Sequence, residues 1–229
     1  MKQILKYFVL SFVILLAGCT SVQNGDSKNI AQYSSPYVAE LQKSKPSTES
    51  NASYYARIGK EMVDKKEDPF KVLEVYKKLV TLFSAKSDER QKVLRYILDE
   101  NLKMVTLKKG QDALKMALEL DKLIPKDFYV QNRIIGAYRV LAEEQADRNN
   151  LEGAMQLTQK GLQIRFDPDI MRTQLDIEIL MAKQAIRNNK PNEAKTKLND
   201  IISIADAQDD LKLFAKEKGE AQKLLATIK

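Results

Sequence analysis

The 229-residue chain contains no histidine and a single cysteine, Cys19. The absence of histidine excludes Ser–His and Cys–His nucleophile pairs and histidine-based metal sites. One cysteine cannot form an intramolecular disulfide. A glycine-rich phosphate loop is also absent, because Gly110, Gly136, Gly153 and Gly161 are isolated glycines at expected helix ends or packing positions. The sequence therefore predicts no metal site and no dissociable cofactor.

Carboxylates are the remaining candidates for acid–base chemistry. Acidic residues are paired at Asp99-Glu100, Glu143-Glu144 and Asp209-Asp210. Neighbouring positions on a helix diverge by about 100°, so these pairs do not converge on one substrate atom. A glycosidase needs separated carboxyl groups that meet across a cleft. The pairs are better explained by a solvated helix face, and we expect the chain not to be an enzyme.

The segment 1–18 has the composition of a secretory signal. Lys2 and Lys6 form a positive amino-terminal region, and no acidic residue precedes Asp26. The segment from residue 7 to 16 is apolar except for Ser11. A membrane-spanning helix needs about 20 apolar residues, which is roughly twice this length. The segment therefore predicts a cleaved signal peptide rather than a permanent membrane helix.

The signal ends in Leu16-Ala17-Gly18-Cys19, which resembles the lipobox of bacterial lipoproteins. The resemblance implies transfer of a diacylglyceryl group to Cys19, for which a thiolate is the best side-chain nucleophile. It also implies cleavage between Gly18 and Cys19 and N-acylation of the new amino terminus. Two or more acyl chains anchor a protein stably in a membrane. The alternative is an ordinary secretory signal that contains a cysteine by chance.

Removal of Lys2 and Lys6 from the 38 basic residues leaves 36 against 31 acidic residues, a net charge of +5. This modest excess fits a solvated helical surface. On an exported protein it argues against nucleic acid and leaves anionic lipid or an acidic protein surface as partners. Thr20 follows Cys19, whereas Asp at that position favours inner-membrane retention in enterobacterial lipoproteins. We therefore expect outer-membrane attachment facing the periplasm, or the outer face of the cell membrane in a one-membrane bacterium.

Residues 19–53 are predicted to form a flexible tether. They are rich in Ser, Asn, Gln and Lys, and their apolar residues show little periodicity, so the segment buries too little surface to offset chain entropy. Tyr33, Tyr37 and Val38 are either ordinary linker residues, as the composition favours, or contacts with a partner or the folded body. Residues 54–229 are dominated by helix-forming residues and are predicted to form one helical domain.

Four segments of this domain share a similar sequence pattern, which begins at positions 70, 111, 152 and 192. When Val72, Ala113, Ala154 and Ala194 are aligned, the pattern recurs at a nearly constant interval of about 40 residues. Such an interval indicates stacked helical hairpins. The fold predicted is an all-α solenoid of about four hairpins with a capping helix over residues 211–228. The residues of this helix expected to be buried are Leu211, Phe214, Ala215, Leu224, Leu225 and Ile228. A plain helical bundle is the competing architecture.

The hairpins resemble tetratricopeptide repeats. In the third hairpin, Tyr138, Leu141, Ala142 and Ala154 have the spacing at which that motif packs small residues between two helices. The period exceeds the roughly 34 residues that are usual for the family, so its superhelix geometry does not transfer directly. Asp68-Pro69 and Asp167-Pro168 each place a capping Asp before a Pro at the first helical position, and Asn149 with Glu152 has the spacing of a capping box.

The architecture predicts an adaptor or scaffold that offers a groove to an envelope protein or peptide. By the register of the motif, Arg95, Arg139, Glu143 and Lys183 face this groove or are ordinary exposed charges. Lipoproteins of this build include the helical-repeat component of the outer-membrane β-barrel assembly machine, pilotins of type IV pilus secretins and adaptors of cell-wall enzymes. Outer-membrane protein assembly is our preferred process. The alternatives are a cell-wall enzyme that uses carboxylates such as Glu100 or Glu144, and a purely structural lipoprotein.

Overall fold

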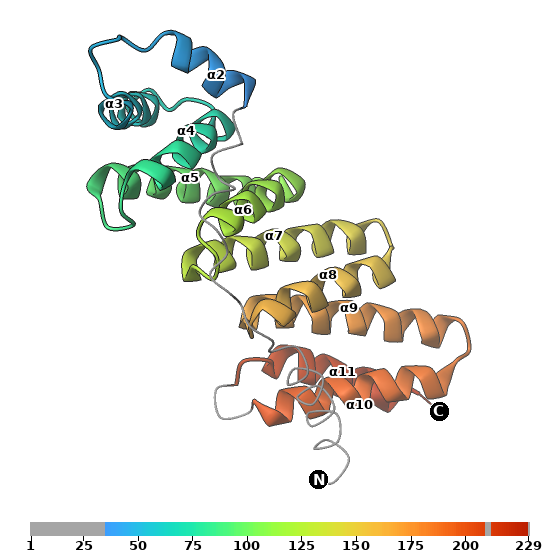
Figure 1. Cartoon of the computed structure of the whole chain (residues 1–229). Coiled ribbons are helices and arrows are strands. Elements are labelled where there is room, and N and C mark those ends of the chain that lie inside the picture. Colours follow the sequence, from blue (N-terminus) through green and yellow to red (C-terminus); the bar gives the residue numbers. More distant parts are fainter. Residues whose placement is uncertain (1–34, 209–211, 229) are drawn as a thin grey trace, which may run out of the picture.

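The structure is a computed structural model that describes residues 35–208 and 212–228. Within these residues the chain is helical and contains no strand. The helices follow one another along an elongated array, with α2 at one end and α11 at the other (Figure 1). Their bounds are α2 (Pro36–Lys43), α3 (Asn51–Asp64), α4 (Pro69–Leu82), α5 (Asp88–Thr106), α6 (Gly110–Leu123), α7 (Phe128–Asp147), α8 (Leu151–Ile164), α9 (Pro168–Arg187), α10 (Pro191–Ala207) and α11 (Ala215–Thr227).

This all-helical arrangement is consistent with an α-solenoid-like array. Contacts join each pair of successive helices from α3 to α11, and α2 contacts α4. In addition, α5 contacts α7, and α7 contacts α9. No helix among residues 35–208 and 212–228 is long and apolar enough to cross a membrane. The predicted signal peptide, Gly18 and Cys19 lie outside the described residues.

The folded body includes Ser35 and helix α2, which the prediction placed in the tether of residues 19–53. The Ser35 hydroxyl accepts a hydrogen bond from the Val38 N–H and begins α2. Val38 is buried in the core, and the Tyr54 hydroxyl donates to the Leu41 carbonyl oxygen over 2.7 Å. The short helix is therefore stabilised by packing rather than by its own length. The rest of the predicted tether, residues 19–34, lies outside the described residues.

Two predicted helix starts are confirmed. The Asp68 carboxylate accepts from the N–H groups of Phe70 and Lys71 over 2.8 and 3.2 Å, directly before Pro69 of α4. Asp167 caps α9 in the same way before a proline. In both, the carboxylate satisfies backbone donors that have no partner inside the helix.

The predicted capping box at Asn149 is wrong by one residue. Asn150 caps α8, and its side-chain oxygen accepts from the Gly153 N–H over 3.2 Å. Asn149 instead has a φ of 60°, in the left-handed region, and belongs to the turn that ends α7. Asn tolerates this conformation better than most residues. Asn149 therefore lies in the turn that ends α7, and Asn150 caps the start of α8.

Four turns share the same backbone hydrogen bonds. The left-handed residues are Lys66, Lys108, Asn149 and Asn189. Each donates its N–H to the carbonyl oxygen three residues earlier, and the next residue donates to the carbonyl oxygen five residues before itself. These two bonds define the Schellman motif, which satisfies carbonyl groups at the end of a helix. The turns α3–α4, α5–α6, α7–α8 and α9–α10 therefore reverse the chain by one local mechanism.

The core runs along the array as connected clusters. The largest joins α2–α7, a second joins α9–α11, and smaller ones lie between them. All four residues aligned in the sequence are fully buried, namely Val72, Ala113, Ala154 and Ala194. Small buried side chains let crossing helices approach closely.

The first helical turn of α6 makes an especially close approach to α7. A Cβ atom added at Gly110 would lie 2.8 Å from Leu141 Cγ. That atom is a branching carbon in a buried side chain and cannot move aside easily. We predict that Gly110→Ala lowers the free energy of unfolding by about 1–3 kcal/mol, the usual cost of overpacking.

Gly219 of α11 is the matched control, because a Cβ there meets no atom within 4 Å. Gly219→Ala should instead stabilise the protein by about 0.5–1 kcal/mol, since alanine loses less entropy in a helix. Chemical denaturation of the two variants measures both values. Equal shifts of the same sign would show that the α6–α7 contact is looser than the distances indicate.

The carboxy-terminal helix is shorter than predicted, and its expected buried set is only partly correct. It spans Ala215–Thr227. Phe214 just before it is buried as expected, and Leu224, Leu225 and Ile228 are partly buried against the same cluster, whereas Ala215 is exposed. Glu217 and Ala221 are buried instead. The Glu217 carboxylate lies 3.8 Å from the Arg172 guanidinium of α9. Leu211, also expected in the core, lies outside the described residues.

Candidate functional site

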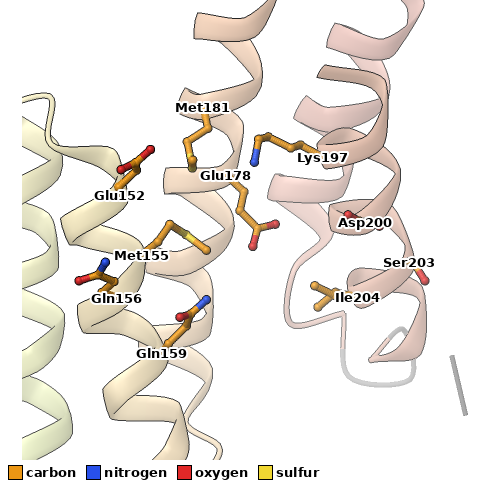
Figure 2. Close-up of a pocket in the computed structure, with 10 residues that line it drawn as sticks. All are labelled: Glu152, Met155, Gln156, Gln159, Glu178, Met181, Lys197, Asp200, Ser203 and Ile204. Atoms are coloured by element: carbon orange, nitrogen blue, oxygen red, sulfur yellow. The ribbon is translucent and has the colours of Figure 1, made fainter. Parts of the chain in front are cut away.

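An open groove of about 680 Å³ lies between α8, α9 and α10. Met155, Gln159, Glu178, Lys197 and Ile204 point toward the space between the helices in Figure 2, whereas Gln156 and Ser203 point away from it in this view. The lining residues are Glu152, Met155, Gln156 and Gln159 of α8, Glu178 and Met181 of α9, and Lys197, Asp200, Ser203 and Ile204 of α10.

Helical periodicity places these residues together. On α8 the lining positions follow the spacing i, i+3, i+4, i+7, and α10 contributes positions 197, 200, 203 and 204. Residues three and four apart share one face of a helix. Each helix therefore presents one continuous stripe to the groove, and α9 between them adds positions 178 and 181.

The apolar part of the groove consists of Met155, Met181 and Ile204. The two methionines pack against the buried cluster that includes Ala142 and Ala154. The apolar part of the groove therefore rests on the core where α7 and α8 cross. Methionine side chains adapt to irregular apolar partners and are common at surfaces that accept varied sequences.

The charged part of the groove is predominantly acidic. Glu152, Glu178 and Asp200 carry negative charges against the single positive charge of Lys197. None of these four side chains forms an ion pair within residues 35–208 and 212–228. Figure 2 shows the Lys197 ammonium and the Glu178 carboxylate directed into the space between α9 and α10. The groove therefore holds unmatched negative charge beside an apolar floor.

Glu178 is the most perturbed acid of the groove. Burial raises the pKa of its carboxyl, while a hydrogen bond from Gln174 over 3.1 Å and the positive charge of Lys197 lower that pKa. The net shift is upward because desolvation is the largest of these effects. A partly desolvated carboxyl without an ion pair is a common property of binding sites.

The four residues predicted from the repeat register do not line this groove. Arg95 lines a separate pocket between α3 and α5. Arg139 donates to Glu143 of the same helix over 2.8 Å, and Lys183 donates to Glu220 of α11 over 2.7 Å. The structure therefore brings together only Arg139 and Glu143.

The carboxylates considered for catalysis also lie elsewhere. Glu100 accepts a hydrogen bond from Lys103 on the same helix. Neither Glu100 nor Glu144 lines the α8–α10 groove. No group of acidic or cysteine side chains arranged to hold a metal ion occurs in the described ranges.

The chain matches no protein-family model, no curated protein and no solved structure. Its function is therefore inferred from the chemistry of the groove and of the amino-terminal sequence.

Proposed function

We propose that this protein is a membrane-anchored adaptor that binds a cationic, amphipathic segment of an envelope protein in the α8–α10 groove. The observation that carries the proposal is the set of three carboxylates, Glu152, Glu178 and Asp200, which form no ion pair in the part of the chain that the structure describes and lie beside Met155 and Met181. Lysine or arginine side chains of the segment would pair with Glu152, Glu178 and Asp200. Its apolar side chains would pack on Met155 and Met181. Laying an amphipathic helix into a groove is a common mode of peptide recognition.

The array is proposed to consist of four tetratricopeptide-like hairpins with a period of about 40 residues. Two observations support this. The second helix of each hairpin begins at Pro69, Gly110, Leu151 or Pro191, and the four turns before these helices share the Schellman motif. In such an array each hairpin contacts mainly its neighbours, and a groove between adjacent hairpins is a natural binding surface.

Lipidation at Cys19 is proposed to confine this groove to the membrane surface. Attachment of a binding site near its partners raises their effective concentration without adding any contact. On the resemblances of the sequence, the anchor lies in the outer membrane facing the periplasm, and outer-membrane protein assembly is the process we propose. An amphipathic segment that has not yet folded is a suitable ligand for the groove in that process.

Peptide binding to the full chain in detergent tests the proposal. The probe is a fluorescent peptide of Leu and Lys with helical periodicity, about 15 residues long so that it can form a helix. Fluorescence anisotropy measures the dissociation constant. We expect the triple variant Glu152→Gln, Glu178→Gln, Asp200→Asn to bind at least about tenfold more weakly, since a tenfold change corresponds to about 1.4 kcal/mol. Each charge pair at a partly exposed site contributes up to about 1 kcal/mol.

A second triple variant controls for net charge alone. It removes three exposed acids on α2, α5 and α6, outside the groove, through Glu40→Gln, Glu89→Gln and Asp112→Asn. This variant should keep its affinity within about twofold, because exposed charges separated by more than about 8–10 Å are screened at physiological salt. Equal weakening in the two triple variants, or equal binding of a Leu and Glu peptide, would contradict the groove as the binding site.

A further inference from the structure

One edge of the array carries exposed aromatic rings. Phe128 and Tyr129 in the first turn of α7 are 58% and 63% exposed, and Phe166 in the turn before α9 is 49% exposed. Figure 1 shows that the α6–α7 and α8–α9 turns lie at the same edge of the array. We call Phe128, Tyr129, Arg165 and Phe166 the aromatic edge. Contiguous exposed apolar side chains of this size mark contact surfaces.

The aromatic edge is held in place by contacts between its two turns. The Arg165 guanidinium lies over the Phe128 ring, 4.3 Å from its centre, and donates to the Asn132 side-chain oxygen of α7. The Phe128 and Tyr129 rings pack edge to face with centres 5.7 Å apart. The exposure of these rings is therefore a property of an ordered surface.

We propose that the aromatic edge docks on the surface of the lipid bilayer. Amphipathic rings gather at the headgroup level of membranes, and cationic side chains beside them attract anionic headgroups. Arg165 supplies one positive charge. Two acids, Asp127 and Asp167, lie beside the rings, but their carboxylates accept hydrogen bonds from the first N–H groups of α7 and α9, and the Asp167 carboxylate also lies 4.0 Å from the Arg165 guanidinium. Lys126, exposed in the α6–α7 turn, supplies a second positive charge and forms no ion pair in the described part of the chain. The rings sit on turns at an edge rather than inside a groove, which suits a soft, continuous surface better than a convex protein partner.

The length of chain before the body permits this contact, which rests on the proposed lipid anchor at Cys19. Fifteen residues separate Cys19 from Ser35. An extended chain spans at most about 3.3–3.6 Å per residue, so this segment reaches roughly 50 Å. A lipid anchor alone leaves the orientation of the array undetermined. A second contact through the aromatic edge would fix that orientation and hold the groove at a constant height above the bilayer.

A fluorophore attached to single cysteines in the full lipidated chain tests the docking. Because lipidation consumes the thiol of Cys19, Phe166→Cys introduces the only reactive thiol. Leu107→Cys is the matched control, since Leu107 is 67% exposed in the α5–α6 turn, at the opposite edge in Figure 1. In phosphatidylcholine–phosphatidylglycerol vesicles that carry nitroxide lipids, we expect at least threefold stronger quenching at position 166 than at 107. Lys126→Glu, or vesicles without phosphatidylglycerol, should reduce the quenching at 166.

The outcomes separate the docking from the anchor. A chain that floats with vesicles but is quenched equally at positions 166 and 107 overturns the docking and leaves the anchor intact. A wild-type chain that takes up the fluorophore at Cys19 and does not float overturns the anchor, and the docking with it. Weak quenching at 166 combined with crosslinking from 166 to another protein, or to a second copy of this chain, overturns the docking in favour of that partner.

Discussion

Replacement of Asn101 by aspartate is expected to lower the free energy of unfolding by about 3–5 kcal/mol at neutral pH. Asn101 of α5 is fully buried, and its Nδ2 donates to the Ala113 carbonyl oxygen of α6 over 2.7 Å. Its Oδ1 has no hydrogen-bond partner in the described residues. Asn101→Asp would remove the donor and place an unpaired negative charge opposite a carbonyl oxygen. A buried charge without a partner is among the most destabilising changes in a protein.

The destabilisation should depend on pH in a defined direction. Burial favours the neutral form of the introduced carboxyl, so its pKa is expected to be higher in the folded state than in the unfolded chain. Below about pH 4, near the unfolded value, both states are protonated and the acid O–H can donate to Ala113. As pH rises from there toward the folded pKa, stability should fall by about 1.4 kcal/mol per unit. Urea denaturation between pH 4 and pH 8 measures the slope.

Asn101→Leu is the control for this experiment. It removes the amide and adds no charge, so it leaves no new unpaired group in the side chain itself. The Ala113 carbonyl lies inside helix α6 and keeps its hydrogen bond within that helix, so no buried acceptor loses its last partner. We expect a small change in stability without additional pH dependence. Absence of the pH dependence in Asn101→Asp would show that position 101 is reached by water. An equal pH dependence in Asn101→Leu would assign the effect to another titrating group.

The parts of the fold that follow from local chemistry were predictable from the sequence. An Asp before a Pro specifies a helix start at Asp68 and Asp167, because the carboxylate and the fixed proline φ act within three residues. The small residue Ala113 is buried where α6 packs against α5 and α7, because a close helix crossing leaves room for little beyond a Cβ atom. These features need no knowledge of distant contacts.

The features that the sequence did not predict depend on contacts between segments far apart. Helix α2 lies in a polar stretch and is stabilised by contacts such as that of Tyr54 with Leu41, which composition does not reveal. Asn149 and Asn150 are both good caps, and the left-handed turn at Asn149 decides between them. The position of a Schellman turn depends on where the preceding helix ends, which is a property of its packing.

The candidate site was missed for a related reason. The predicted repeat register favours α5, α7 and α9, which hold Arg95, Arg139 and Lys183. The groove is formed mainly by α8 and α10, with α9 between them. A local signal existed, because polar residues and Met155 recur on one face of α8 at helical spacing. Nothing in the sequence shows that this face meets the matching face of α10.

Glu178→Lys is expected to reduce binding of the Leu and Lys peptide by at least about 100-fold, or about 2.7 kcal/mol. The change removes one negative charge and adds a positive charge close to Lys197. Like charges across an interface cost up to several kcal/mol, and more where water is partly excluded. Glu40→Lys makes the same change in net charge on an exposed face of α2, outside the groove, and should weaken binding by less than about threefold. Comparable losses in the two variants would assign the effect to the overall field of the protein.

The same carboxyl gives the binding a pH dependence with a defined sign. Burial raises the pKa of Glu178, so in the free protein this group takes up a proton at a higher pH than an ordinary glutamate does. A cationic peptide binds the ionised form more tightly, so its affinity should be full above the raised pKa and should fall as acidification neutralises Glu178. Glu178→Gln should bind weakly and lack this part of the dependence, whereas exposed acids titrate in both proteins at lower pH. Anisotropy titrations of wild type and Glu178→Gln from pH 4 to pH 8 compare the two directly. Parallel curves would show that another group causes the pH dependence of peptide affinity, because the two proteins differ only at Glu178.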